Sequence, residues 1–115
     1  MYQFSYAEIL EEAPAIARER ERAAFDRALD LLRIADRPDA QQPDRAMAAG
    51  FLQSLWGVLI EDLQSEENGL PPDLRADLVS IGLWSMHEAN AVIAEPDRAL
   101  SALIAVNTSI RDGLR

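Results

Sequence analysis

The fold is decided by residues 47–63, MAAGFLQSLWGVLIEDL. Most large apolar side chains recur there at helical intervals, and they are Met47, Phe51, Leu52, Leu55, Trp56, Leu59, Ile60 and Leu63. This spacing puts them on one side of an α-helix, which has about 3.6 residues per turn. We therefore predict an amphipathic helix that buries this side against the rest of the chain.

The same helical spacing recurs on both sides of this segment. Residues 15–36 and the segments that follow Pro72 and Pro96 each carry such a set of apolar side chains. The sets are, in chain order, Phe25, Ala28, Leu29, Leu31, Leu32 and Ala35; Leu74, Leu78, Val79, Ile81, Leu83, Met86 and Ile93; and Leu100, Leu103, Ile104, Ile110 and Leu114. The set after Pro72 covers a wide part of its helix, which predicts burial on two sides.

Pro-Asp pairs mark the predicted helix starts. Three of them, at residues 43–44, 72–73 and 96–97, stand before the apolar segments. Proline is favoured in the first turn because its missing N–H needs no partner there, and aspartate suits the positive end of the helix dipole. The pair Asn68-Gly69 is a typical helix stop.

The N-terminal part of the chain predicts a further, short helix. Ser5 and Glu8 have the spacing of a capping box, in which each side chain satisfies a free backbone N–H at the helix start. We expect this helix to end near Glu12. Pro14 should break it or begin the next helix, because a proline inside a helix removes a hydrogen bond and clashes with the preceding turn.

These elements together define the fold class. No segment alternates apolar and polar residues over the length of a strand, so we predict no strands. The chain has 115 residues, 49% of them hydrophobic, which is enough for one core. The expected fold is all-α: an antiparallel bundle of about four main helices plus a short N-terminal helix, in a single domain over residues 1–115.

The acidic charge is concentrated in the middle of the chain. The sequence has a net charge of −9, and residues 46–97 hold nine acidic residues against Arg75 alone. Such a surface repels the phosphates of nucleic acids, so we expect no direct nucleic-acid binding. The run RERER at residues 18–22 is expected to neutralise itself on a helix surface, through Glu19–Arg22 and Arg22–Asp26 pairs.

Few residues are suited to enzymatic or metal chemistry. The chain has no cysteine, which excludes disulfides and thiolate metal sites, and His87 is the only histidine. Glu61-Asp62 and Glu66-Glu67 are neighbours that point to different sides of a helix, and they match no di-metal or calcium-loop motif. We expect no enzymatic activity, no cofactor and no bound metal.

The sequence also lacks the marks of export and of membrane insertion. Its first residues do not have the basic and then apolar pattern of a signal peptide. The longest apolar run, residues 55–60, is far shorter than the ~20 residues that span a bilayer. We expect a cytoplasmic protein without membrane insertion.

The few aromatic residues fall into two groups. Trp56 and Trp84 each lie in a segment rich in Leu and Ile, so both are expected in the core. Tyr2, Phe4 and Tyr6 stand at the N-terminus, where a chain is usually polar and loosely held. They either close the core of the bundle or line a surface groove, and both interpretations stay open.

Four stretches of the chain together resemble the flagellar biosynthesis regulator FlaF family. They are MYQFSYAEI at residues 1–9, LWGVLIEDL at 55–63, LPPDLRADLVSIGLW at 70–84 and IRDGLR at 110–115. Because they are spread in this order from the first residue to the last, the resemblance covers the whole chain. The chain departs from the family pattern at Gly57, where a bulkier residue is expected.

The resemblance implies a non-enzymatic role in supplying flagellin to the flagellum. Members of the family promote flagellin synthesis or secretion, in opposition to the repressor FlbT. The resemblance favours a chaperone-like protein that binds unassembled flagellin, whose terminal segments form amphipathic helices only when packed. The alternative is a post-transcriptional regulator that acts on flagellin mRNA directly or through a partner such as FlbT. The candidate flagellin-binding residues are Tyr2, Phe4, Tyr6, Ile9 and Leu10.

Overall fold

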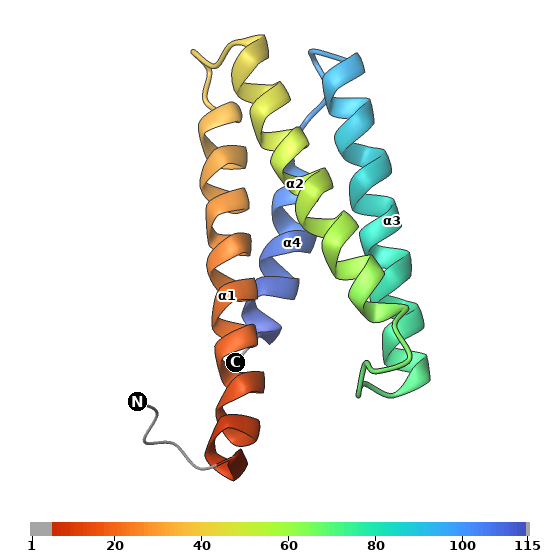
Figure 1. Ribbon diagram of the computed structural model, residues 1–115. Helices are drawn as coiled ribbons and strands as arrows, with labels where there is room; N and C mark the ends of the chain where they lie inside the picture. The colour runs from red at the N-terminus through yellow and green to blue at the C-terminus, as the bar shows by residue number, and fades with distance from the viewer. Residues whose placement is uncertain (1–5, 115) are drawn as a thin grey trace.

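The computed structural model describes the backbone of residues 6–114 and the side chains of residues 17–114. It contains four helices, α1 (Tyr6–Ala35), α2 (Gln42–Leu63), α3 (Pro72–Ala94) and α4 (Ser101–Gly113). Loops join them at alternate ends, so that successive helices run antiparallel (Figure 1). The predicted all-α bundle of four main helices is confirmed, and no strand occurs in the part of the chain described.

Helix α2 occupies the centre of the arrangement. It packs against α1 on one side and α3 on the other, whereas α4 lies behind α2 in Figure 1 and packs mainly against α1. Contact between α3 and α4 is slight. The two helices are therefore not closely packed, and near the end of α4 both contribute residues to an open pocket.

The predicted break at Pro14 is wrong. Helix α1 runs without interruption from Tyr6 to Ala35, so the segment expected as a separate short helix forms its first turns. Pro14 removes the one backbone hydrogen bond to the carbonyl of Leu10. The remaining bonds on both sides hold the helix together. Ser5, the predicted cap, lies outside the described residues.

Two of the three predicted helix starts are confirmed. Pro43 lies in the first turn of α2, and the Oδ2 atom of Asp44 accepts a hydrogen bond of 2.9 Å from the backbone N–H of Gln41. Pro72 is the first residue of α3. In both cases the Pro-Asp pair acts as the sequence indicated, because proline needs no donor there and aspartate satisfies or faces free N–H groups.

The third predicted start, at Pro96-Asp97, is wrong. These residues form a turn, and α4 begins at Ser101. The reason lies on α2, where Nη2 of Arg45 donates hydrogen bonds to the carbonyls of Val92, Glu95 and Arg98, at 3.1, 3.1 and 2.9 Å. This guanidinium satisfies carbonyls at the end of α3 and in the loop, and thereby holds the loop in a non-helical path.

Helix α1 contributes the largest share of the core, as predicted. All six of its predicted apolar side chains are buried, and Leu52 and Trp56 of α2 pack with them. Phe25 and Trp56 meet edge to face, with ring centroids 5.6 Å apart. Val92, Leu100 and Leu103 complete this core from α3 and the start of α4.

Four predicted core residues instead lie at the surface. The exposed fraction is 62% for Met47, 44% for Leu74, 56% for Leu83 and 38% for Trp84. Burial of α3 on two sides was therefore wrong, because α3 packs against α2 and only slightly against α4. Its buried strip consists of small residues and one valine, namely Gly82, Ser85, Ala89 and Val92.

The small residues of α3 allow α2 to come close. The ring of Trp56 lies directly over Gly82, where an added Cβ would be 2.9 Å from Cζ3 of the indole and closer still to Cε3. The indole Nε1–H donates a 2.8 Å hydrogen bond to Oδ1 of Asn107 on α4. Asn107 in turn donates to the carbonyl of Leu103 at 2.9 Å and to Oγ of Ser85 at 3.4 Å. This buried network fixes the position of Trp56 relative to three helices.

Candidate binding groove

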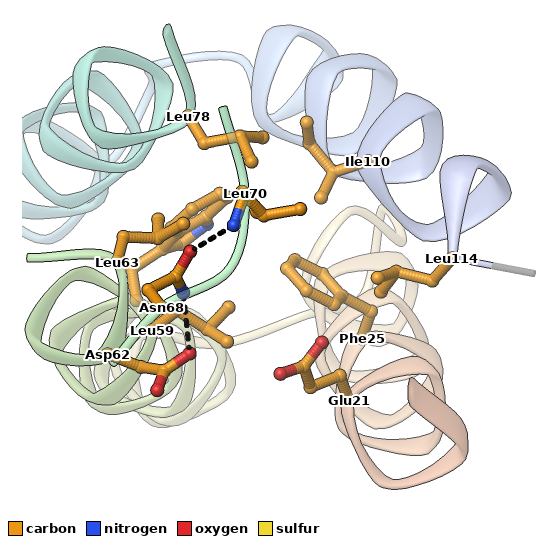
Figure 2. Close-up of a pocket in the computed structure, with 11 residues that line it drawn as sticks. Glu21, Phe25, Leu59, Asp62, Leu63, Asn68, Leu70, Leu78, Ile110 and Leu114 are labelled. Atoms are coloured by element: carbon orange, nitrogen blue, oxygen red, sulfur yellow. Dashed lines mark hydrogen bonds between the residues drawn. The ribbon is translucent and has the colours of Figure 1, made fainter. Parts of the chain in front are cut away.

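A groove opens at the end of the bundle where α2 and α4 end and α3 begins (Figure 2). An inner cavity of about 120 Å³ continues into an outer depression of about 540 Å³, and the two share most of their lining residues. We call this continuous feature the groove. Its apolar lining consists of Phe25, Trp56, Leu59, Leu63, Leu70, Leu74, Leu78, Ile110 and Leu114.

The groove exists because side chains from four helices converge without filling the space between them. In Figure 2, Leu78 of α3 and Ile110 of α4 lie across the groove from Leu59 of α2 and Phe25 of α1. The slight contact between α3 and α4 leaves this end of the bundle open. Apolar side chains thus remain accessible at a concave surface, which is typical of a binding site.

The loop between α2 and α3 forms one wall of the groove. Asn68 holds this loop with two hydrogen bonds: its Oδ1 accepts from the backbone N–H of Leu70 at 3.0 Å, and its Nδ2 donates to Oδ2 of Asp62 at 3.2 Å (Figure 2). These bonds place Leu70 over the groove, where it is 39% exposed. Helix α2 already ends at Leu63, with Gln64 as its C-cap, so Asn68-Gly69 lies in the loop after the helix stop and its asparagine positions a lining residue.

Two carboxylates, Glu21 of α1 and Asp62 of α2, border the groove, and we call them the acidic rim. Both are drawn on the same side of the groove in Figure 2. Partial burial raises the pKa of Glu21, and the negative charge of Asp62 raises it further, whereas Arg18 lowers it. Arg18 is the one basic side chain that lines the groove within the described residues.

The end of α4 is fixed to α1 beside the groove. Nε of Arg111 donates a 2.7 Å hydrogen bond to Oδ1 of Asp26, and Nη1 of Arg22 donates to the carbonyl of Leu114 at 3.1 Å. The hydrogen bond from Arg111 lowers the pKa of Asp26. Arg22 and Asp26 thus form their hydrogen bonds near the end of α4. The charge of Arg22 also lowers the pKa of Asp26, as expected of the predicted pair, whereas Glu19 and Arg22 form no ion pair within 4.0 Å.

The flagellin-binding residues predicted from the sequence are not tested by these observations. Tyr2 and Phe4 lie outside the described residues, and so do the side chains of Tyr6, Ile9 and Leu10 on the first turns of α1. Their role stays a prediction.

Sequence reasoning did not identify the groove residues as a site, although one signal was available. Three of the four stretches that carry the family resemblance, residues 55–63, 70–84 and 110–115, all contribute to the groove. They are far apart in the chain, and only the tertiary structure brings them together.

No arrangement suited to metal chemistry occurs in the described part of the chain, where no three potential ligands come together. His87 is exposed. Its neighbour Glu88 accepts two hydrogen bonds from Arg98, at 2.7 and 3.0 Å, so this carboxylate holds the α3–α4 connection. Within the described residues, none of the helices is both long and apolar enough to cross a membrane.

Comparison with known protein families identifies a match to this chain. The sequence model of the family described as "Flagellar protein FlaF" matches residues 2–114 of this chain. No curated protein and no solved structure matches the sequence of this chain.

Proposed function

Because the chain belongs to the flagellar protein FlaF family, we propose that it acts in flagellum biogenesis by binding unassembled flagellin in the groove. In the cytoplasm, binding would keep a flagellin segment from aggregating, and it would thereby promote flagellin synthesis and secretion. The function is that of a chaperone-like binding protein rather than an enzyme.

One observation carries this proposal: three separate stretches that resemble the family line the same groove. Residues 55–63, 70–84 and 110–115 meet only at this end of the bundle. If these stretches served packing alone, we would expect them to be spread over the whole core. The core extends to the opposite end of the bundle through Ala35, Ala48 and Leu100.

The shape and chemistry of the groove suit a helical ligand. An amphipathic helix binds by laying its apolar side into a hydrophobic groove, with anchors at helical spacing. Leu70 and Leu74 are 39% and 44% exposed at the edge of the groove, where they would contact such a helix. A flagellin segment that is unfolded before assembly supplies an apolar side of this kind.

The N-terminal residues predicted to bind flagellin are compatible with this site by their position in the chain. Arg18 and Glu21 of α1 line the groove, and the first turns of α1 continue beyond them toward Tyr6. We propose that residues 2–10 add to the contact with flagellin where it leaves the groove.

The alternative, a regulator that binds flagellin mRNA directly, is disfavoured by charge. The net charge of −9 and the acidic rim oppose phosphate binding. Action through a partner such as FlbT is compatible with flagellin binding, since a chaperone that captures flagellin can change the amount available to a regulator.

The proposal is tested by isothermal titration of purified flagellin monomers into the full-length protein. The variant Leu70→Ser/Leu74→Ser removes two exposed groove side chains. The matched control, Met47→Ser/Leu83→Ser, removes side chains that are 62% and 56% exposed on other surfaces. We expect the groove variant to weaken binding by about ten-fold or more, because each anchor of a helix interface contributes on the order of 2 kcal/mol.

The control variant should bind within about two-fold of the wild type. If the wild-type protein does not bind flagellin, the proposed function is wrong. If both double variants lose affinity equally, binding does not depend on the groove. Adding a flagellin leader RNA to the same protein tests the alternative, since tight binding that weakens steeply with salt would favour it.

A further inference from the structure

The charged lining of the groove is unbalanced. Glu21 and Asp62 border its apolar surface, and Arg18 lies only at the outer depression. Asp62 accepts a hydrogen bond from the neutral amide of Asn68. Among the residues whose side chains are described, neither rim carboxylate forms an ion pair within 4.0 Å.

Nearby arginines are engaged elsewhere. Arg22, the neighbour of Glu21 in sequence, donates to the carbonyl of Leu114 at 3.1 Å. Arg111 pairs with Asp26 at 2.7 Å, and Arg75 donates to the carbonyl of Ser65 at 3.4 Å. The bundle thus uses these three cations to hold its own elements. Arg18 is the one described cation left beside the acidic rim, and its charge partly offsets that of Glu21 without an ion pair within 4.0 Å.

This arrangement has an energetic cost for the free protein. Partial burial and the charge of Asp62 raise the pKa of Glu21 by more than the charge of Arg18 lowers it, so the ionised carboxylate is disfavoured where it stands. Groups held in unfavourable ionisation states beside a cleft are often binding groups. A cation supplied by a ligand would relieve the repulsion between the two carboxylates.

From this geometry we infer that the groove selects an amphipathic helix that carries lysine or arginine beside its apolar side, the cation being placed against Glu21 and Asp62. The inference rests on the proposed function, because it specifies which part of flagellin the groove accepts. A second copy of this chain is a poor occupant, since each copy has a net charge of −9.

Two synthetic peptides test this selection directly. Both form the same amphipathic helix with a Leu/Ala apolar stripe, and they differ only at the positions flanking the stripe, which are Lys in one and Gln in the other. Binding is measured by titration at low and at high salt. We expect the wild type to prefer the Lys peptide by about ten-fold at low salt, and by much less at high salt because ions screen partly exposed charges.

The protein variants then locate the preference. Glu21→Gln/Asp62→Asn should bind the two peptides within about two-fold of each other. The control Asp39→Asn/Asp97→Asn removes the same charge from exposed loops at the opposite end of the bundle, and it should keep the preference. Thermal melts followed by circular dichroism verify that both variants are folded.

The outcomes separate this inference from the proposed function. If the wild type does not bind flagellin, the proposed function itself fails. If it binds flagellin but binds the two peptides equally, or binds neither, the selection for a basic helix is wrong and the proposed function stands. A preference that persists in Glu21→Gln/Asp62→Asn would also overturn the role of the acidic rim.

Discussion

Replacing Gly82 with alanine tests how closely α2 and α3 pack. A Cβ at this position would lie 2.9 Å from Cζ3 of Trp56, closer still to Cε3, and 3.1 Å from Cδ1 of Ile60. Trp56 cannot move aside easily, because its indole Nε1–H is bound to Asn107 at 2.8 Å and its ring packs on Phe25. The added methyl group must therefore push the two helices apart or distort the indole.

The size of the effect follows from two opposing contributions. Adding a methyl group to a well-packed core costs about 1–3 kcal/mol. Alanine in place of glycine inside a helix returns up to about 1 kcal/mol. Because the added Cβ would lie less than 3.0 Å from two indole atoms, we expect the upper part of this cost, about 2–3 kcal/mol. Gly82→Ala should then lower the free energy of unfolding by about 1–2 kcal/mol, and the melting temperature by about 4 °C for each kcal/mol in a chain of this length.

Gly57→Ala is the matched control. Gly57 also lies inside a helix, but a Cβ there has no atom within 4 Å beyond its own neighbourhood. Only the gain in helix propensity remains, so this variant should be more stable than the wild type by about 0.5–1 kcal/mol. Urea and thermal unfolding followed by circular dichroism measure both variants. Equal shifts in the two variants, or a Gly82→Ala protein as stable as the wild type, would refute the close packing described above.

Two further perturbations probe the contacts of α4. Asn107→Ala leaves the buried Nε1–H of Trp56 without an acceptor, so we expect the free energy of unfolding to fall by about 2–4 kcal/mol. The exposed control Ser109→Ala should lose less than about 0.5 kcal/mol. Urea unfolding measures both variants, and a loss for Asn107→Ala as small as that of the control would contradict this expectation. Asp26→Asn removes a carboxylate whose pKa is lowered from 3.8 by Arg111. Because the pKa of Asp26 is lower in the folded chain than in the unfolded chain, ionised Asp26 stabilises the fold at pH values above 3.8. The variant should therefore melt below the wild type at neutral pH, and the difference should disappear as the pH falls below 3.8 and through the lower pKa of the folded state. Thermal melts across this pH range measure the difference, and a gap that persists in acid would show that the ion pair is not its cause.

Much of the fold could be predicted from residues that are close together in the sequence. Helical spacing identified the four main helices and all six core side chains of α1, and Pro43 and Pro72 marked two helix starts. These features depend on backbone hydrogen bonds between residues four apart and on the preferences of single residues, so a local segment contains the information.

The errors occurred where a distant residue overrides a local preference. Pro96-Asp97 has a typical helix-start sequence, but Arg45 of α2 binds the carbonyls of this region and holds it as a turn. Trp84 has the hydrophobicity of a core residue and is 38% exposed, because the neighbouring helices pack on a different strip of α3. Hydrophobicity alone does not reveal which side of a helix will find a partner.

The sequence by itself determined the all-α class with its four main helices, the acidic character of the chain and, through four separate stretches, its family. Only the tertiary structure decided that three of those stretches meet in one groove and that Glu21 and Asp62 border it together. The physical reason is that packing of α2 against the small residues Gly82 and Ser85, and the weak contact between α3 and α4, set the space between helices. Such spacing arises from pairs of residues far apart in the chain, such as Trp56 and Asn107, which no local pattern links.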